Sequence, residues 1–274
     1  MTWRWDPTLY AGSAAHYVRG RVAYPQALAD LLAAEVGLDR SGRLLDVGCG
    51  PGSLTLLLAP LVAEATGLDA DPDMLAEAER LAVRAGLANV RWRLLRAEDL
   101  PAGLGTFRLV TFAQSLHWMD RRRVAAAVHG MLEAGGTCVH VHATTHEGVE
   151  GSRRLPHPQP PRTAIAELVR GYLGPQRRAG RGVLPAGTPA GEDDVYRAAG
   201  FAGPRRLDLP GVVIERTADQ VLAAVLSLSG STPHLFGPRL AAFETDLRRL
   251  LHQTSPTGVF SQQMREIALD IWHP

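Results

Sequence analysis

One aspartate and three glycines lie close together in residues 44–58, LLDVGCGPGSLTLLL. Asp46 stands near the end of an apolar run, and Gly48, Gly50 and Gly52 follow it before leucines at helical spacing. Glycine is needed where a chain turns sharply and where its backbone must approach a ligand closely. The segment therefore predicts a strand, a glycine-rich turn and a helix, which is the general arrangement for binding a nucleotide cofactor.

The spacing of these glycines separates two classes of nucleotide cofactor. A dinucleotide site requires the pattern G-x-G-x-x-G, which seats a pyrophosphate on the N-terminus of the helix. Ser53 occupies the position of the last glycine of that pattern, so the glycines fall as G-x-G-x-G, with Cys49 inside the turn. A nucleotide oxidoreductase is therefore disfavoured, and the turn is expected to bind a different nucleotide.

Polar residues also follow the next three apolar runs. Asp69 ends the second run, about 20 residues after the turn, where a carboxylate can accept hydrogen bonds from both ribose hydroxyls. The third run leads into Ala97-Glu98-Asp99, and the fourth leads into Gln114-Ser115-Leu116-His117-Trp118. Ligands of open α/β sheets bind beyond the carboxyl ends of the strands, so residues 114–118 should border both the cofactor and its reaction partner.

Alternating strands and helices are needed to bring these residues together. Apolar runs predict strands at 43–48, 65–69, 90–95, 107–113, 137–143, 206–214 and 265–272, and later helices near 192–199, at 217–229 and at 239–251. This alternation favours right-handed βαβ units and a parallel sheet. The expected fold is α/β, with a doubly wound, seven-stranded, mostly parallel, Rossmann-like sheet and a helical cap insertion.

Two segments depart from this alternation. Residues 1–36 begin with scattered aromatic residues and continue into a helix, and we expect them to form an N-terminal helical flap. Residues 147–191 are rich in proline, glycine and arginine, with one helical pattern at 163–173, and we expect them to form a lid or substrate insertion. The whole chain, 1–274, is expected to be a single domain.

Composition narrows the classes of function. The 274 residues have a formal net charge of +1 and contain no lysine, which disfavours a nucleic-acid partner. Cys49 and Cys138, the two cysteines, make neither a disulfide framework nor a metal site, so no metal is expected. No secretory leader or membrane-length apolar run is seen. We therefore expect a cytoplasmic monomer or homodimer with no membrane partner.

The D-x-G-x-G pattern resembles motif I of class I S-adenosylmethionine-dependent methyltransferases. The run QSLHW at 114–118 resembles the fourth motif of the small-molecule type 11 methyltransferase family, and the resemblance covers roughly residues 16–145. It implies S-adenosyl-L-methionine as cofactor and S-adenosyl-L-homocysteine as product. In such enzymes the glycine turn lies against the methionine end of the cofactor, where the carboxylate of Asp46 suits a cation, directly or through water.

The same resemblance implies further cofactor contacts. In the loop 97–99, backbone groups and one acid contact the adenine base, and either Glu98 or Asp99 can be that acid. The segment HYVRGRVAYP resembles the family's N-terminal helix, which folds over the cofactor. Tyr17 and Arg21 are candidates there, with Arg21 for the amino-acid carboxylate, unless both only anchor the flap.

Residues after the fourth and fifth strands are candidates for catalysis. Methyl transfer needs orientation above all, and it needs a general base only when the acceptor must lose a proton. His117 is the candidate base or orienting residue, because the usual pKa of histidine is near neutrality, unless it is purely structural. Trp118 is a candidate stacking wall, and His146 and Tyr172 are candidate substrate contacts.

The expected acceptor is a small molecule methylated on an O, N or C atom. A bacterial natural product or an aromatic metabolite, indole-like or quinone-like, would suit a pocket that carries a tryptophan. Methylation of RNA or protein is the main alternative, disfavoured by the neutral charge and by the lack of an N-P-P-Y-type run after the fourth strand. A non-catalytic adenosyl-binding module is the other alternative.

Overall fold

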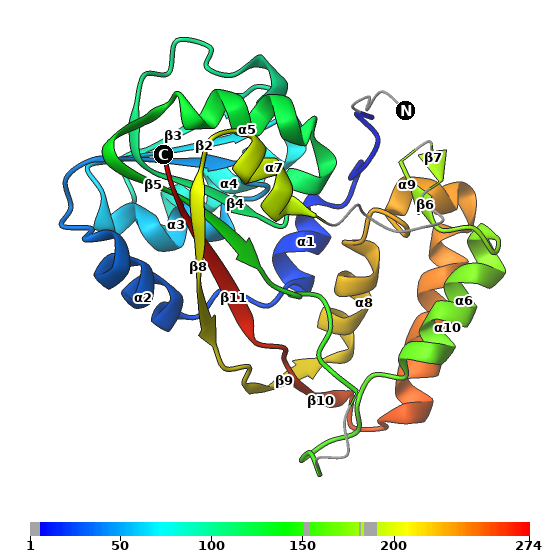
Figure 1. Cartoon of the computed structure of the whole chain (residues 1–274). Helices are drawn as coiled ribbons and strands as arrows, with labels where there is room; N and C mark the ends of the chain where they lie inside the picture. The colour runs from blue at the N-terminus through cyan, green and yellow to red at the C-terminus, as the bar shows by residue number, and fades with distance from the viewer. Residues whose placement is uncertain (1–5, 151–153, 181, 184–190) are drawn as a thin grey trace.

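Seven strands form one sheet in the order β3-β2-β1-β4-β5-β11-β8 (Figure 1). The computed structural model describes residues 6–150, 154–180, 182–183 and 191–274. The strands of the sheet are β1 (Arg43–Val47), β2 (Glu64–Asp69), β3 (Val90–Leu94), β4 (Phe107–Ala113), β5 (Leu132–His142), β8 (Ala202–Leu209) and β11 (Ile267–His273). Strands β1 to β5 pair in parallel, and β11 runs antiparallel to β5 and β8. The prediction of a seven-stranded, mostly parallel sheet is confirmed.

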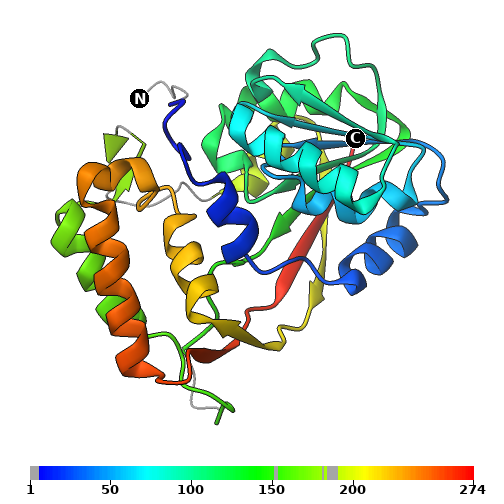
Figure 2. The same cartoon turned by 180° about the vertical axis from the view of Figure 1, so that it is seen from behind.

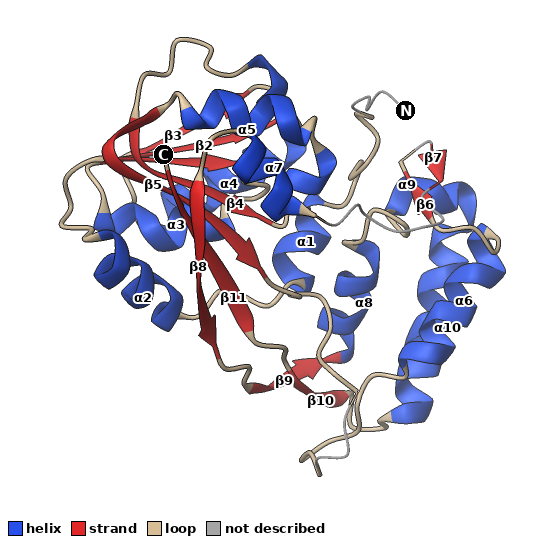
Figure 3. Cartoon of the chain, viewed as in Figure 1, coloured by secondary structure: helices blue, strands red, loops and turns tan. Residues whose placement is uncertain are grey.

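Helices cover both faces of the sheet, as Figure 3 shows. Successive strand residues face opposite sides, so Leu44 and Val139 join one apolar core while Leu45 and Cys138 join the other. The first core lies under α2 and α3, and the second lies under α5 and α7. The helices are α2 (Gln26–Val36), α3 (Ser53–Leu58), α4 (Pro72–Ala85), α5 (Arg121–His129) and α7 (Glu192–Ala198), with 3-10 turns η1 (Ala59–Leu61), η2 (Ala97–Asp99) and η3 (Leu116–Trp118).

A separate helical layer, named the cap here, stands beside the sheet (Figure 1). It comprises α6 (Arg162–Leu173), α8 (Ala218–Leu226), α9 (Pro233–Phe236), η4 (Gly237–Arg239), α10 (Leu240–Thr254), the paired strands β9 (Val213–Thr217) and β10 (Val259–Gln263), and the short pair β6 (Arg178–Ala179) and β7 (Gly182–Val183). The cap has its own apolar core, which includes Ile165, Leu222, Phe243 and Phe260. No helix in the described ranges is long and apolar enough to cross a membrane.

The cap is built from two stretches of chain, one after β5 and one between β8 and β11. The helices predicted at 217–229 and 239–251 belong to it as α8 and α10, although the alternating pattern had suggested helices that cover the sheet. Periodicity shows which side of a helix is buried, but it does not identify the partner. The strand expected at 206–214 ends earlier, at Leu209, and the chain then crosses into the cap.

Parts of two predicted segments lie outside the described residues. These are residues 1–5 of the expected flap and residues 151–153, 181 and 184–190 of the expected insertion. The described part of the flap contains α1 (Ala14–Gly20), and the described part of the insertion contains α6.

Helix α1 lies between the sheet and α8 (Figure 2). The two helices meet at Gly20, where a Cβ atom would lie 2.2 Å from the backbone nitrogen of Ala224 and 2.3 Å from the carbonyl carbon of Ala223. Only a glycine permits this approach, because both neighbouring atoms belong to the backbone and cannot move aside. Residues 221–226 of α8 are all buried, since α1 and the rest of the cap pack against opposite sides of that helix.

We expect Gly20→Ala to lower the free energy of unfolding by about 1–3 kcal/mol, the usual effect of overpacking. Gly171→Ala is the matched control, because Gly171 lies in α6, where a Cβ atom would meet nothing within 4 Å. That control should be stabilised by about 0.5–1 kcal/mol, as expected for alanine in place of glycine inside a helix. Urea unfolding of both variants measures the two effects, and equal stabilities would contradict the close α1–α8 contact.

Candidate cofactor and acceptor site

A pocket lies at the carboxyl ends of β1, β2, β3 and β4, and we name it the cofactor pocket. The parallel strands bring their ends, and the loops that follow them, to one edge of the sheet. Most of the residues predicted to bind the cofactor line it: Tyr17, Asp46, Gly48, Cys49, Gly50, Asp69, Ala97, Glu98, Gln114 and Ser115. The structure therefore brings together residues from five separate stretches of the sequence.

The glycines of the turn serve two different purposes. Gly48, Gly50 and Gly52 all have left-handed backbone, with φ of +69°, +54° and +79°. A Cβ atom on Gly48 would lie 2.6 Å from the Cβ of Ser115, and one on Gly52 would lie 2.6 Å from the ring of Trp92. A Cβ atom on Gly50 would meet nothing within 4 Å. Two glycines thus permit tight packing, and Gly50 leaves open space where a ligand can approach the backbone.

Asp69 holds the turn in place and also faces the pocket. Its Oδ2 accepts a hydrogen bond from the backbone N–H of Gly50 at 2.8 Å, and its Oδ1 accepts one from the N–H of Asp71 at 2.9 Å. Burial raises the pKa of Asp69 to about 6, and the charge of Asp71 adds to that rise. Each carboxylate oxygen keeps a further acceptor position. Asp69 can therefore bind hydroxyl groups in the pocket.

Asp46 is buried at the base of the pocket. Its two carboxylate oxygens accept hydrogen bonds from the hydroxyls of Thr55 and Thr111, at 2.6 and 2.8 Å. Burial raises the pKa of this carboxyl group. Together with Asp69 and Glu98 it gives the lining three carboxyl groups. A positively charged ligand would stabilise their ionised forms, whereas a diphosphate would be repelled.

The sequence did not decide which acid of the loop after β3, Glu98 or Asp99, contacts the adenine base, and the structure distinguishes the two. Glu98 is buried in the pocket lining, where its Oε1 accepts a hydrogen bond from the N–H of Asp120 at 2.8 Å and its Oε2 lies 3.5 Å from Arg96. Asp99 is exposed and does not line the pocket, because the single turn of η2 directs adjacent side chains apart. This corrects the expectation for Asp99, and it favours Glu98 as the acid that contacts the adenine base.

Aromatic side chains form the outer wall of the cofactor pocket. Tyr10 packs edge-on against Tyr17 and Trp118, with ring centroids 6.4 and 6.2 Å apart. Tyr24 accepts a hydrogen bond from the side-chain amide of Gln114 at 3.1 Å. The enclosed volume is about 90 Å³, below the roughly 300–1,000 Å³ of typical ligand pockets. In this conformation the pocket is therefore smaller than a nucleoside requires.

Arg21 is not in the lining of the cofactor pocket, contrary to expectation. Its Nε donates to the Ser227 hydroxyl at 2.8 Å, and a terminal nitrogen donates to the Ser227 carbonyl at 3.0 Å. Its guanidinium also lies 4.5 Å from the ring centroid of Tyr17. The difference arises because α1 docks on α8, a contact between segments 206 residues apart that local sequence patterns cannot reveal.

A second cavity, of about 770 Å³, adjoins the cofactor pocket through Gln114, which lines both. We name it the histidine cavity because His117, His140 and His142 line it. His142 is oriented by a 2.7 Å contact between its Nε2 and Asp270. The structure thus separates two neighbours in the sequence, since Trp118 lines the cofactor pocket and His117 lines the histidine cavity.

His117 is neutral at physiological pH. Burial, together with the charges of Arg177 and Arg121, lowers its pKa to about 4. Its ring lies against that of Trp118, with centroids 4.9 Å apart. A histidine with so low a pKa is a weak proton acceptor. The surroundings of His117 therefore favour the orienting role over the role of general base.

A third cavity, of about 650 Å³, lies between α6 and α8 and is named the cap cavity. His146 lines it, together with arginines and apolar residues of the two helices. Tyr172 does not, although it lies on α6: its hydroxyl donates to Asp246 at 2.7 Å and its ring packs on Phe243. This corrects the expectation for Tyr172, whose side of α6 is covered by α10.

Several residues that line the cofactor pocket were not predicted from the sequence. Met74, Leu95 and Met119 line the cofactor pocket without belonging to any chemical pattern. Tyr10 and Tyr24 also line it, and the density of aromatic residues near the N-terminus was the available signal. Apolar contacts of this kind follow from the fold, because many different residues satisfy them.

Comparison with known proteins agrees with this site. Residues 44–136 match the family described as "Methyltransferase domain". An uncharacterized methyltransferase from Mycobacterium tuberculosis is 33% identical over 153 residues, which are 56% of this chain and 59% of that protein. A trans-aconitate 2-methyltransferase from a Mycobacterium species is 42% identical over 89 residues, 32% of each chain. The chain thus spans 59% of the length of the first of these relatives and 32% of the length of the second.

A solved structure of the YcgJ protein from Bacillus subtilis has the same fold. It superposes with a TM-score of 0.53 at 20% identity, covering 90% of this chain and 98% of the other. Residues 44–136 thus resemble a methyltransferase domain, and the sheet order and the glycine turn with Asp69 agree with that match. The family match ends at residue 136, before the cap begins.

Proposed function

We propose that this chain transfers the methyl group of S-adenosylmethionine to an O, N or C atom of a small molecule held between sheet and cap. The proposed acceptor is a metabolite with an apolar, aromatic body, such as an indole-like or quinone-like natural product. When bound, the cofactor supplies a methyl carbon already activated by the sulfonium, so the protein has to bind and orient the two partners.

One observation carries this proposal. Gln114 lines both the cofactor pocket and the histidine cavity, so the two meet at this residue, and we propose that the acceptor reaches the cofactor there. The backbone of Gln114 is left-handed, with φ of +57°, a strained conformation for a residue with a side chain. Strain of this kind is typical of functional sites, where the surrounding structure holds it in place.

The residues of the cofactor pocket have the chemistry that the proposal needs. Asp69 accepts hydrogen bonds from the ribose, Glu98 accepts one from the adenine amine, and Asp46 lowers the energy of a cation at the methionine end. The open face of Gly50 allows the cofactor to lie against the turn. His117, neutral in its cavity, orients the acceptor.

The N-terminal segment is proposed to act as a flap. Tyr10 and Tyr17 occupy the outer wall of a pocket that is too small for a nucleoside in its present form. An outward shift would admit the cofactor, and return of the flap would exclude water from the reacting groups.

The known relatives support a small molecule as acceptor, because one of them is named for methylation of trans-aconitate. The absence of a basic excess in the sequence also supports this choice over RNA.

The direct test is ligand binding by the purified full chain, followed by turnover. We expect saturating S-adenosylhomocysteine to raise the Tm by about 5–10 °C, whereas NAD leaves it unchanged. Release of S-adenosylhomocysteine from S-adenosylmethionine is then measured with panels of small aromatic acceptors and with bulk tRNA. Stabilisation by NAD alone would contradict the proposal, and turnover with tRNA but with no small molecule would assign the acceptor to the RNA class.

A further inference from the structure

The cap cavity combines a cationic lining with an apolar wall. Four arginines line it, Arg162, Arg170, Arg177 and Arg216, and Glu147 is the single carboxylate among its lining residues in the described parts of the chain. The apolar wall comes from α6 and α8 and includes Ile165, Val169, Leu173, Val221, Val225 and Leu228. Such a chamber suits a ligand with one anionic end and an apolar body.

Arg216 is buried without an acidic partner. Its guanidinium donates to four neutral oxygens: the carbonyls of His146 at 2.9 Å, of Gln220 at 2.8 Å and of Gly20, and the side-chain oxygen of Gln262 at 3.1 Å. No carboxylate is among the contacts that the described residues make with it. Burial and the charge of Arg21 lower its pKa to about 10, so it remains protonated at neutral pH. Its hydrogen bonds are satisfied, but its charge is not neutralised.

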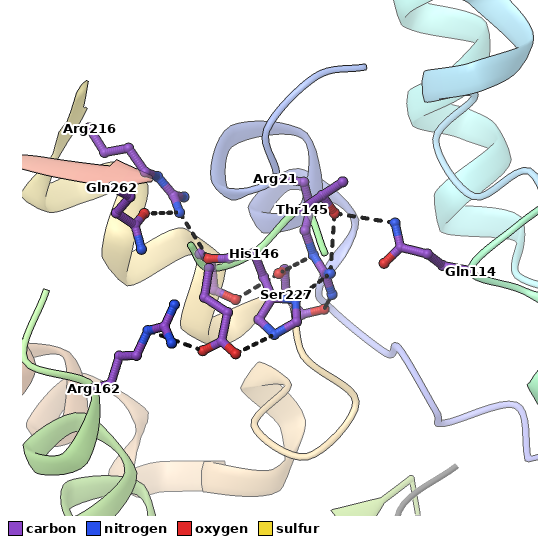
Figure 4. Close-up of polar contacts among 10 residues, drawn as sticks. Arg21, Gln114, Thr145, His146, Arg162, Arg216, Ser227 and Gln262 are labelled. Atoms are coloured by element: carbon purple, nitrogen blue, oxygen red, sulfur yellow. Dashed lines mark hydrogen bonds and ion pairs between the residues drawn. The ribbon is translucent and has the colours of Figure 1, made fainter. Parts of the chain in front are cut away.

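Arg21 is partly buried and contacts His146, a residue of the cavity lining (Figure 4). Its partners are Ser227, the hydroxyl of Thr145 at 3.5 Å and the Nδ1 of His146 at 3.2 Å, all of them uncharged. Burial, together with the charges of Arg21, Arg162, Arg216 and Arg177, lowers the pKa of His146 to about 3. Buried charges in proteins are normally paired, because removal from water without a counter-ion is unfavourable. Glu147, the carboxylate of the cavity lining, lies 3.6 Å from Arg162 and is not among the contacts of Arg21 or Arg216.

We propose that the acceptor itself supplies a further anion to this arginine-rich cavity, as a carboxylate that binds against Arg177 and Arg162, the latter of which already pairs with Glu147 at 3.6 Å. Its apolar body lies along α6 and α8, and its reactive end lies beside Gln114, where the histidine cavity meets the cofactor pocket. This inference rests on the proposed function and narrows it to aromatic or other apolar carboxylic acids. A monoanion fits better than a phosphate dianion, because Glu147 stays in the lining and most donors of Arg21 and Arg216 are already engaged.

A short chain of polar contacts joins this cavity to the cofactor pocket (Figure 4). The amide nitrogen of Gln114 lies 3.5 Å from the Thr145 hydroxyl, which lies 3.5 Å from Arg21, which lies 3.2 Å from His146. The charge of Arg177 also lowers the pKa of both His146 and His117, so it acts on the cap cavity and on the histidine cavity.

The experiment compares acids with their uncharged amides on protein saturated with S-adenosylhomocysteine. The probes are benzoate and benzamide, indole-3-acetate and indole-3-acetamide, and 2-naphthoate and 2-naphthamide, measured by calorimetric titration. We expect at least one acid to bind about tenfold or more tightly than its amide, the effect of a charge-assisted hydrogen bond.

Three variants test the location of the site. Arg162→Gln should remove most of the preference for the acid and leave amide binding unchanged. Glu147→Gln should increase the affinity for the acid by about three- to tenfold, since it removes the one opposing charge, and an improvement of this kind cannot result from misfolding. Arg249→Gln is the control, because Arg249 is an exposed residue of α10 paired with Asp246 outside the cavity.

Equal binding of every acid and its amide, or a decrease in acid affinity in Glu147→Gln, would overturn the carboxylate assignment. The prior titration with S-adenosylhomocysteine keeps the two proposals distinguishable. If the protein binds S-adenosylhomocysteine and turns over an uncharged acceptor, the inference fails and the proposed function stands. If S-adenosylhomocysteine does not bind, the proposed function itself fails.

Discussion

Gly50→Ala is expected to weaken the binding of S-adenosylhomocysteine at least tenfold while leaving the fold intact. A Cβ atom at this position meets no protein atom within 4 Å, and the open space beside it belongs to the cofactor pocket. The methyl group would therefore occupy room that the cofactor needs. The left-handed φ of +54° is unfavourable for alanine and should lower the free energy of unfolding by about 1–2 kcal/mol. Calorimetric titration measures the affinity, and urea unfolding measures the stability.

Gly86→Ala is the matched control for this variant. Gly86 also has left-handed backbone, with φ of +68°, and a Cβ atom there also meets nothing within 4 Å. It ends α4 and does not line the cofactor pocket. The two variants should therefore lose similar stability, while only Gly50→Ala loses affinity. Equal affinities in both would show that the turn does not lie against the ligand.

The affinity for S-adenosylhomocysteine should rise about tenfold between pH 5 and pH 8 and then remain constant. The reason is Asp69, whose pKa burial raises to about 6, because only the ionised carboxylate can accept hydrogen bonds from both ribose hydroxyls. At pH 5 about one molecule in ten carries that charge. His117 and His146 do not titrate in this range, since their pKa values are lowered to about 4 and about 3.

Asp69→Asn should bind more weakly at pH 8 and show no such rise. The raised pKa has a second consequence for the protein without ligand. The folded chain holds the proton of Asp69 more tightly than the unfolded chain does, so this group's contribution to stability is present below pH 4 and is lost as the pH rises through about 6. A wild-type affinity that stays constant from pH 5 to pH 8 would exclude Asp69 from the binding of the nucleoside.

The sheet and the cofactor pocket could be predicted because their signals are local. Each strand carries its own apolar run, and the polar residues of the pocket follow directly after strand ends, as Asp69 follows β2 and Gln114 follows β4. A parallel sheet then brings these ends together without further information. Glu98 and Asp99 were indistinguishable in the sequence, because the direction of each side chain depends on a single 3-10 turn.

The cap could not be predicted in the same way, because its contacts join distant segments. The pattern of α8 indicates burial on all sides but not by which helices. Tyr172 was expected in a pocket, yet its partner Asp246 lies 74 residues away on α10. Arg21 was expected at the cofactor, yet it binds Ser227 at the end of α8. The histidine cavity and the cap cavity likewise depend on how the sheet and cap meet, which no local pattern encodes.

The contact between α1 and α8 has a consequence for how the two ligands influence each other. Tyr17 of α1 lines the cofactor pocket, and Val221 and Val225 of α8 line the cap cavity, while the close approach at Gly20 fixes these helices to one another. Any shift of α1 that accompanies nucleoside binding must also move α8, which forms a wall of the cap cavity. Binding of a ligand in the cofactor pocket then changes the affinity of the cap cavity for its own ligand. Thermodynamic reciprocity requires that binding in the cap cavity change the affinity of the cofactor pocket by the same factor.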